Sequence, residues 1–588
     1  MMNGALILTV SMILVKVIGM LYKMPLANVY LLEGKGYFST AYNLYSPIYA
    51  IAITGLPIAI ARMVSERMVL ERYNDVRQIR KVASRIFLLV GTVGFAVMLL
   101  AAYPYAMRYG GINSLPAMFA IAPSLFFCCL MSVYRGYYEG LRNMYPTAIS
   151  QVIEALCKLI LGLVLAILVV NLGNAEFAAS GTVFGKIAAS ESEAADLIYS
   201  WSAAASILGI TVGTLFGSIY LIARHMLKGD GITKENLLES PAAASNKELR
   251  KELIKVAIPI VLSSVVLNVT NFIDNANVKR LLNVMVAKFP EVIQSIYGTA
   301  FANGNIVTDA RRANYIWGLY NTTLDFRTLI PTIVTALGVS ALPAISAAWA
   351  KREKMDVQRI INTILRVSMM IALPAGFGMA VLSKEIMTLF YESSNAGMAE
   401  HASKLLIMFG LFTWLMAVSA PIVSMLQGIG RADVPVKTLI IGTAAKLGVN
   451  YMLVSNPRIN VNGAAIGTVI FFFIVVAGNL YMLLHESKTK LKLTSVLWKP
   501  LFCSALCAAT AWLFSSLTQR FAPRLVPSLF GDSTKLLMLA AIGLAIAGAV
   551  LVYAVTMLLT RAVTADDLEF LPKGKKIGKM LAKHGLLG

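Results

Sequence analysis

Charged residues are scarce in this sequence, and acidic residues are scarcer than basic ones. Only 14% of the 588 residues are charged, against 58% that are hydrophobic, and 30 Asp and Glu stand against 52 Lys and Arg. Soluble domains carry about a quarter of their residues as charges. The composition therefore excludes a soluble globular protein and a disordered chain, and it predicts a polytopic membrane protein of the all-α class.

Histidine, cysteine and catalytic motifs are also sparse. The four histidines are scattered, and the five cysteines, Cys128, Cys129, Cys157, Cys503 and Cys507, lie in apolar segments as small buried side chains do. There is no Walker A motif, no His-Glu-x-x-His, no Gly-x-Ser-x-Gly and no zinc-ligand spacing. We therefore expect no enzyme activity, no catalytic residue, no metal and no cofactor. The net charge of +22 comes without a nucleic-acid-binding motif, so we expect no nucleic-acid partner.

Long apolar runs, by contrast, are abundant. Fourteen of them reach the length of about 20 residues that crosses a bilayer. They cover residues 5–27, 42–61, 86–105, 115–133, 147–170, 200–223, 256–278, 315–346, 362–382, 404–424, 435–455, 462–484, 499–517 and 536–559. With both termini inside, the cytoplasmic connections hold 33 Lys and Arg and the external ones 12. This bias predicts a multi-pass protein of the bacterial cytoplasmic membrane with both termini in the cytoplasm.

The chain also repeats itself at an offset of 281 to 289 residues. Leu56-Pro57 and the stretch 75–79 recur as Leu342-Pro343 and 356–360, and Gly140, Pro146 and Lys158 recur as Gly428, Pro435 and Lys446. Six crossings return a chain to its starting side, so the repeat predicts two six-helix lobes in parallel orientation. The predicted domains are a lobe over 1–230, a cytoplasmic linker over 231–250, a second lobe over 251–485, two helices over 486–560 and a basic cytoplasmic tail over 561–588.

Ionisable residues inside the apolar runs or directly at their ends are the best indication of function. They include the bases Lys16, Lys23, Lys158, Lys279, Arg280, Arg327 and Lys446, and the acids Glu154, Asp274 and Asp325. A cation at the bilayer centre costs roughly 2.5–3.5 kcal/mol on insertion scales, so most of these bases should face a wet cavity or a partner. A cavity with surplus positive charge favours an anionic substrate.

Four of the bases are predicted to bind that substrate. Lys16 and Lys23 lie two turns apart on one face of the first helix, where lysine meets a phosphate as a mobile point charge. Arg327 lies in a helix interrupted by polar residues, as the binding segments of transporters often are. Glu154 stands four residues before Lys158, whereas Gly442 stands four residues before Lys446. Lys446 has no carboxylate at that spacing, which favours its contact with cargo. Structural pairing, and snorkelling for Lys23, remain the alternatives.

Four more residues are candidates for ion coupling or structural pairing. Glu154 and Lys158 stand four residues apart in the favourable order and can neutralise each other. Asp274 can bind a coupling monovalent cation or pair with Lys279 or Arg280, and Asp325 can pair with Arg327.

Several motifs resemble those of a known superfamily. Tyr134-Arg-Gly-Tyr-Tyr-Glu-Gly140 and Met144-Tyr-Pro-Thr-Ala-Ile-Ser-Gln151 resemble the connection between the fourth and fifth helices of the stage V sporulation protein B group. That group belongs to the multidrug/oligosaccharidyl-lipid/polysaccharide (MOP) flippase superfamily. The stretches 16–27 and 55–61 resemble the same group, while 371–374 and 431–437 resemble MurJ-type lipid II flippases.

The resemblance implies two lobes that open alternately to the two membrane faces, with a lipid-linked oligosaccharide as cargo. Lys16, Lys23 and Arg327 match cavity cations of MurJ-type proteins by position, whereas the arginine pair of their second helix has no counterpart in the stretch 47–55. We therefore expect a flippase for a polyprenyl-pyrophosphate-linked glycan, with lipid II as first candidate. A capsular or exopolysaccharide unit and, second, a multidrug or cation antiporter are the alternatives. A membrane glycosyltransferase is disfavoured, since the longest external connection, 279–314, offers only Glu291 and Asp309.

Overall fold

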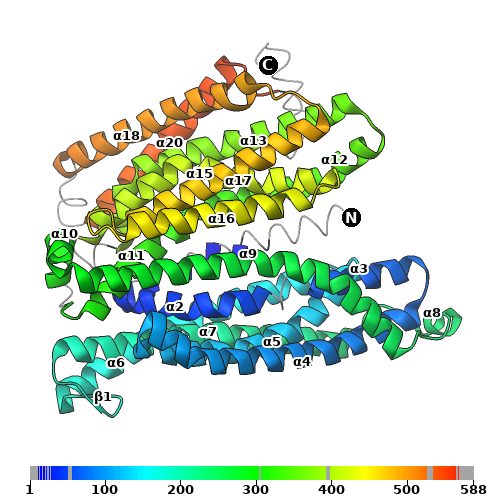
Figure 1. The fold of residues 1–588 in the computed structure, drawn as a ribbon, viewed down its shortest axis with the longest axis horizontal. Coiled ribbons are helices and arrows are strands. Elements are labelled where there is room, and N and C mark those ends of the chain that lie inside the picture. Colours follow the sequence, from blue (N-terminus) through cyan, green and yellow to red (C-terminus); the bar gives the residue numbers. More distant parts are fainter. Residues whose placement is uncertain are drawn as a thin grey trace. The chain divides into compact units, whose positions relative to one another are not determined.

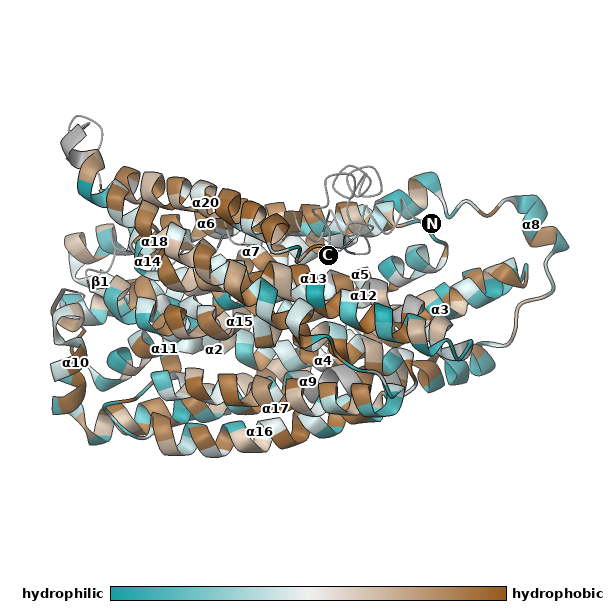
Figure 2. Ribbon diagram, turned by 90° about the horizontal axis from the view of Figure 1, so that it is seen from above, coloured by the Kyte–Doolittle hydropathy of each residue, from teal (hydrophilic) through white to brown (hydrophobic). Residues whose placement is uncertain are grey.

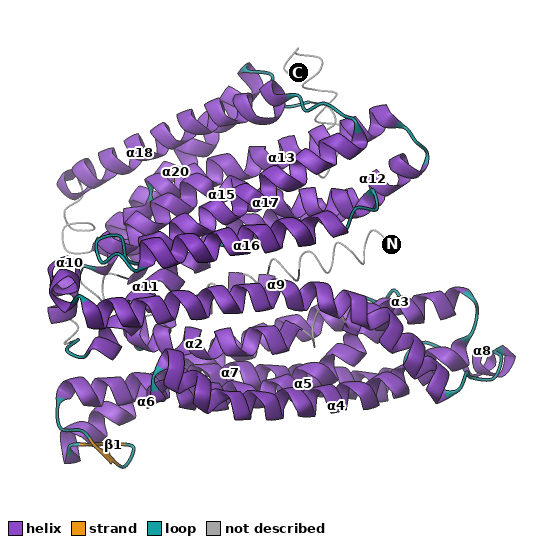
Figure 3. Cartoon of the chain, viewed as in Figure 1, coloured by secondary structure: helices purple, strands orange, loops and turns teal. Residues whose placement is uncertain are grey.

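The computed structural model describes residues 28–50, 56–303, 306–391, 397–525 and 534–564, together with Asp567 and ten positions between 11 and 26. These residues are almost entirely helical, and the described strands belong to one short hairpin (Figure 3). The chain forms two compact units, Met1–Asn321 and Thr322–Gly588, whose boundary falls inside helix α11 (Asp309–Arg327). The all-α class predicted from the sequence is confirmed.

The first unit begins with helices that follow one another through short connections. They are α2 (Leu31–Ala50), α3 (Leu56–Val69), α4 (Tyr73–Tyr105), α5 (Leu115–Gly140), α6 (Tyr145–Ser180), α7 (Glu191–Lys228), α8 (Lys234–Glu239), α9 (Asn246–Lys288), α10 (Pro290–Asn303) and the first part of α11. A π turn, η2 (Ala106–Gly110), and a 3-10 turn, η3 (Ile112–Ser114), join α4 to α5. The strands β1 (Thr182–Val183) and β2 (Lys186–Ile187) pair antiparallel between α6 and α7.

Local sequence explains where several of these helices begin. Pro116 and Pro146 stand in the first turns of α5 and α6, where the missing backbone N–H leaves no hydrogen bond unmade. Ser245 and Glu248 form a capping box at the start of α9, in which each side chain accepts a hydrogen bond from the other's backbone N–H.

In the first unit α5 packs on α4 and α7, α6 packs on α7, and α2 packs against α5, α7 and α9 (Figure 1). α2 also crosses α11 at close range. A Cβ atom added to Gly36 would lie 2.8 Å from the backbone oxygen of Asn314, which no larger residue tolerates without a shift of one helix. Gly36 therefore fixes the point at which α2 meets α11.

The second unit is likewise helical. It contains α12 (Leu329–Ala350), α13 (Lys354–Val381), α14 (Ser383–Tyr391), α15 (Met398–Gly428), α16 (Asp433–Val454), α17 (Asn462–Ser487), the π turn η4 (Thr494–Trp498), α18 (Lys499–Leu525) and α20 (Thr534–Leu559). α12, α13 and α17 pack on α15, α16 lies along α17, and α18 packs on both α13 and α20. Beyond α20, the carboxylate of Asp567 accepts hydrogen bonds of 2.8–2.9 Å from the buried guanidinium of Arg366. The chain that follows the last helix is thereby attached to α13.

Nine helical stretches in the described part of the chain are long and apolar enough to cross a membrane. They are Tyr73–Tyr109, Ile112–Gly140, Tyr145–Ser180, Glu191–Lys228, Lys354–Val381, Met398–Gly428, Asn462–Ser487, Thr494–Ala522 and Leu536–Leu559. Each coincides with one of the predicted runs, and hydrophobic colour dominates α20 whereas α8 is hydrophilic (Figure 2). The multi-pass membrane character is confirmed. The total of fourteen crossings and the orientation of the termini stay predictions.

The structure differs from the predicted boundaries in two places. The interval 28–41, which separates the first two predicted runs, is helical from Leu31 onward. Hydropathy marked it as a connection because of Glu33 and Lys35, yet both are buried inside the protein. The predicted external connection 279–314 consists mainly of the end of α9, helix α10 and the start of α11. The two repeat-related lobes and their bounds stay a prediction; the packing boundary itself lies at Asn321–Thr322 because α9 packs on α2, α3 and α4.

The predicted orientation can be tested with single cysteines at exposed positions, in a variant whose five native cysteines are replaced. Leu70→Cys, Leu238→Cys and Lys490→Cys should react with a membrane-impermeant maleimide only after the cells are opened, because positive-inside bias places them in the cytoplasm. Ile187→Cys and Glu400→Cys should react in intact cells. Reaction of Leu238→Cys in intact cells would reverse the topology, and the cysteine-replaced parent gives the background.

Candidate functional site

Two of the four predicted substrate-binding bases, Lys16 and Lys23, lie outside the described residues, and the other two lie in the second unit. The guanidinium carbon of Arg327 lies 5.3 Å from the ring centroid of Phe409. The ammonium of Lys446 lies 5.9 Å from that of Phe471. Both side chains are partly buried, and an aromatic face stabilises a desolvated cation. Their role in substrate binding stays a prediction.

The predicted pair of Glu154 and Lys158 has other partners in the first unit. The carboxylate of Glu154 accepts a hydrogen bond of 3.1 Å from Arg135 on α5, whose Nε donates to Ser150 at 2.9 Å. The ammonium of Lys158 lies 4.9 Å from the ring centroid of Tyr22. Glu154 thereby ties α6 to α5, and its predicted pairing with Lys158 stays a prediction.

The predicted acids fall in different units. Asp274 is buried in α9 of the first unit, and Asp325 is partly buried in the part of α11 that belongs to the second unit. The neighbouring Lys279 is also buried, and its ammonium donates a hydrogen bond to the side-chain oxygen of Asn314 on α11. Asn275 donates to Asn43 on α2 at 2.9 Å. The middle of α9 is thus joined to α2 and α11 by polar contacts.

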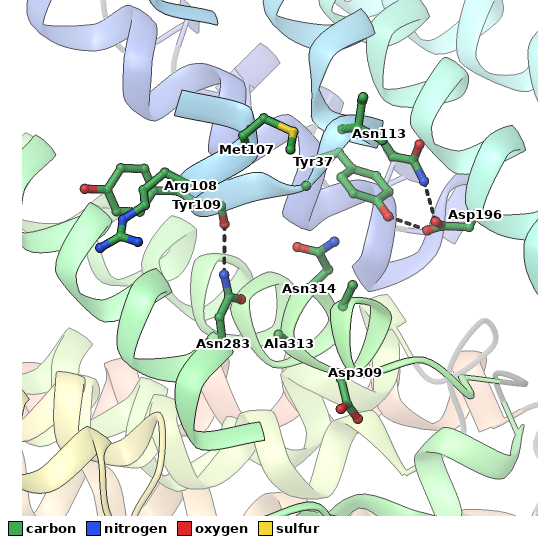
Figure 4. Close-up of a pocket in the computed structure, with 13 residues that line it drawn as sticks. Tyr37, Met107, Arg108, Tyr109, Asn113, Asp196, Asn283, Asp309, Ala313 and Asn314 are labelled. Atoms are coloured by element: carbon green, nitrogen blue, oxygen red, sulfur yellow. Dashed lines mark hydrogen bonds between the residues drawn. The ribbon is translucent and has the colours of Figure 1, made fainter. Parts of the chain in front are cut away.

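A pocket of about 360 Å³, lined by polar and apolar side chains, lies in the first unit (Figure 4). Its walls come from α2, the π turn η2, the adjacent η3, and helices α7, α9 and α11. The hydroxyl of Tyr37 donates to one oxygen of Asp196, and the amide of Asn113 donates to the other (Figure 4). Asn283 donates to the backbone oxygen of Tyr109 at 3.3 Å. Phenol, amide and carboxylate groups of this kind bind hydroxyl- and amide-rich ligands by hydrogen bonds.

A buried ion pair connects the same helices. The guanidinium of Arg311 on α11 donates two hydrogen bonds, of 2.9 and 3.1 Å, to the carboxylate of Glu33 on α2. It also donates to the backbone oxygen of Ser192 on α7 at 2.8 Å. The two charged side chains are only 2% and 1% exposed, so water contributes almost nothing to their solvation. We call Glu33, Arg311, Tyr37, Asp196 and Asn113 the α2–α7–α11 network, because together they hold these three helices at one end of the unit.

The sequence did not reveal this network. Glu33 and Arg311 are 278 positions apart, and Tyr37 and Asp196 are 159 apart, so no local spacing relates them. The signal that was present is the pair of charges at Glu33 and Lys35 next to a predicted span. Charges so close to an apolar run, with Gly36 beside them, are compatible with a buried helix that another helix crosses.

The described pocket and network consist of hydrogen-bonding and ionic side chains. No group of three or more His, Cys, Asp or Glu side chains that could hold a metal ion occurs among the residues the structure covers.

The fold is that of a multi-pass helical membrane transporter. Among solved structures, a lipid II flippase MurJ in an inward closed conformation matches with a TM-score of 0.59 at 13% identity, over 94% of this chain and 98% of that one. An inward-facing multidrug resistance MATE family transporter of the MOP superfamily matches with a TM-score of 0.57 at 16% identity, over 80% and 95%.

Sequence comparison identifies the family. The family model described as lipid II flippase MurJ matches residues 68–531, and this chain belongs to that family. Lipid II flippase MurJ of Bacillus subtilis (strain 168) is 24% identical over 484 residues, covering 80% of this chain and 79% of that protein. Stage V sporulation protein B of the same organism is 23% identical over 583 residues, covering 97% of each. The resemblance seen in the motifs is confirmed.

Proposed function

We propose that this protein moves a polyprenyl-pyrophosphate-linked glycan across the cytoplasmic membrane, with the peptidoglycan precursor lipid II as its first candidate substrate. The observation that carries the proposal is membership of the lipid II flippase MurJ family over residues 68–531. The buried ionisable side chains within its helices support it, because transporters keep such groups for their substrate or coupling ion.

In this proposal the basic residues Lys16, Lys23, Arg327 and Lys446 bind the pyrophosphate while the polyprenyl chain stays in the lipid. Lysine serves as a point charge, and arginine adds two parallel hydrogen bonds. Asp274 is the candidate for a coupling monovalent cation. Transport then proceeds by alternating access, in which helices separate at one end of the molecule while they close at the other.

The α2–α7–α11 network is assigned to the closed end of the first unit. The hydrogen bonds of Arg311 join α11 to α2 and α7. Alternating access must separate α11 from these two helices, so these bonds have to break and form again in each cycle. The pocket beside the network offers amide and carboxylate groups to a glycan headgroup when that end opens.

The substrate assignment is tested by depleting the protein in its own host and analysing lipid-linked precursors on the two membrane faces. Accumulation of inward-facing lipid II supports the leading assignment. Accumulation of a different lipid-linked glycan selects the capsular or exopolysaccharide alternative. If no lipid-linked glycan accumulates and cationic drugs are retained instead, the antiporter reading replaces both.

Lys16→Ala should abolish complementation of the depleted strain while the protein remains inserted and abundant. Lys16 lies deep in the first predicted span, and in the proposal no other side chain replaces its contact with the phosphate. The measurement is growth on the variant alone, with immunoblotting of the membrane fraction. Lys228→Ala, which changes an exposed lysine at the end of α7, is the comparison and should complement the depleted strain. Growth at the wild-type rate with Lys16→Ala at normal abundance would remove Lys16 from the site.

A further inference from the structure

Three helix ends of the first unit bring two arginines onto a group of tyrosines. The guanidinium carbon of Arg80, near the start of α4, lies 5.9 Å from the ring centroids of both Tyr134 and Tyr137 near the end of α5. That of Arg224, near the end of α7, lies 4.8 Å from the centroid of Tyr138. We call these five residues the Arg80–Arg224 cluster.

Among the described residues, no carboxylate forms an ion pair with Arg80 or Arg224. The nearby carboxylate of Asp230 receives 3.0 and 3.1 Å hydrogen bonds from Arg77, a 3.0 Å bond from the hydroxyl of Tyr137 and a 3.1 Å bond from the N–H of Ile232. Burial by itself would raise the pKa of Asp230, but the bonds from Arg77, Ile232 and Tyr137 hold that pKa below its usual range. Asp230 is therefore ionised, and its carboxylate is already paired with Arg77.

The arginines themselves have unused hydrogen-bonding capacity. Among the described residues, the buried Nε of Arg80 and the buried Nη1 of Arg224 have no hydrogen-bond partner. Neither arginine side chain forms an ion pair with a described residue, and the neighbouring Asp230 pairs with Arg77 instead. A desolvated guanidinium whose donors are incompletely used is costly, and a bound anion would remove that cost.

We expect the cluster to lie at the depth of lipid headgroups. Leu88 and Leu89, about two turns along α4 from Arg80, are exposed apolar side chains. Phe216, about two turns before Arg224 on α7, is also exposed. Two turns of helix span about 11 Å. This distance is of the same order as that from the hydrocarbon boundary to the headgroup phosphates. Tyrosine is enriched at this level of the membrane.

We propose that Arg80 and Arg224 bind the phosphate of an anionic phospholipid, whose acyl chains lie in the adjoining membrane. Arginine matches phosphate because its planar fork donates two parallel hydrogen bonds, and the tyrosine rings hold each fork in place. The predicted topology places this end in the cytoplasmic leaflet, where anionic lipids attract basic clusters. The proposed site uses none of the four proposed substrate bases and does not depend on which glycan is transported.

The test uses the full-length protein purified in detergent and measured by native mass spectrometry with phosphatidylglycerol or phosphatidylcholine of matched acyl chains. The wild type should bind phosphatidylglycerol more tightly than phosphatidylcholine. Arg80→Gln/Arg224→Gln should lose about tenfold or more of that preference, since two charge-assisted hydrogen-bonding groups are removed. The matched control Lys81→Gln/Lys228→Gln removes the same charge from exposed lysines of the same helices and should keep the preference.

A second variant guards against loss of the fold. Arg80→Lys/Arg224→Lys keeps both charges but lacks the guanidinium fork, so it should bind phosphatidylglycerol with intermediate preference even if the glutamine variant aggregates. Equal binding of the two lipids by the wild type, an unchanged preference in the folded glutamine or lysine variant, or an equal loss in the Lys81/Lys228 control would each overturn the proposal. Displacement of the lipid by inorganic phosphate at comparable concentration would show a free-phosphate site and would overturn the lipid assignment.

Discussion

Arg311→Gln should strongly destabilise the protein, because it leaves the carboxylate of Glu33 buried without its charged partner. Removing one member of a buried ion pair typically costs about 3–5 kcal/mol, a large part of the stability of most proteins. The two side chains are almost completely buried and share two hydrogen bonds, which meets the conditions for that cost. The measurement is the thermal unfolding midpoint in detergent, together with the amount of protein in the membrane.

The double variant Glu33→Gln/Arg311→Gln separates a role in folding from a role in transport. Two amides can still form a hydrogen bond without a buried charge, so the unfolding midpoint should return most of the way to that of the wild type. If the network also holds the closed end, this stable double variant should open too readily and transport poorly. Arg312→Gln, which removes a neighbouring arginine paired with Asp309 at 3.4 Å, is the matched control and should change little. Wild-type stability in the single variant would contradict the prediction.

Reversing the charge of Arg327 should impair transport far more than neutralising it. At an effective dielectric constant of about 20, unit charges about 4 Å apart interact by about 4 kcal/mol. Arg327→Gln removes one attraction for the pyrophosphate, whereas Arg327→Glu replaces it with a repulsion of similar size. Arg327→Lys keeps the charge and should retain most activity. Complementation of the depleted strain at equal protein abundance measures the series.

The structural alternative for Arg327 is tested by its neighbours in the second unit. If Arg327 only serves an ion pair with Asp325, exchanging both in Arg327→Glu/Asp325→Arg should restore transport. If it only packs on the ring of Phe409, then Phe409→Leu should reproduce the effect of Arg327→Gln. Rescue by the exchange, or an equal effect of Phe409→Leu, would withdraw Arg327 from the substrate site.

Charged residues in or beside a predicted membrane span have different surroundings in two parts of this chain. Lys446 lies within a predicted span and meets an aromatic ring, as the cost of a cation in lipid requires. Glu33 and Lys35 were assigned to a connection by the same hydropathy criterion, although they belong to the buried helix α2. A hydropathy scale compares residues with lipid and water, and it cannot recognise a polar helix whose surroundings are the protein's own helices.

The sequence by itself determined the membrane class, the helical fold and nine spans that the structure shows as long apolar helices, because crossing a bilayer demands about 20 apolar residues in one run. Its motifs also identified the family. Only the tertiary structure decided which polar groups meet: Glu33 with Arg311, Glu154 with Arg135, and Arg80 with two tyrosines of α5. These partners lie on different helices, and their separations along the chain range from 19 to 278 residues. Helix packing brings them together, and no periodicity within one segment carries that information.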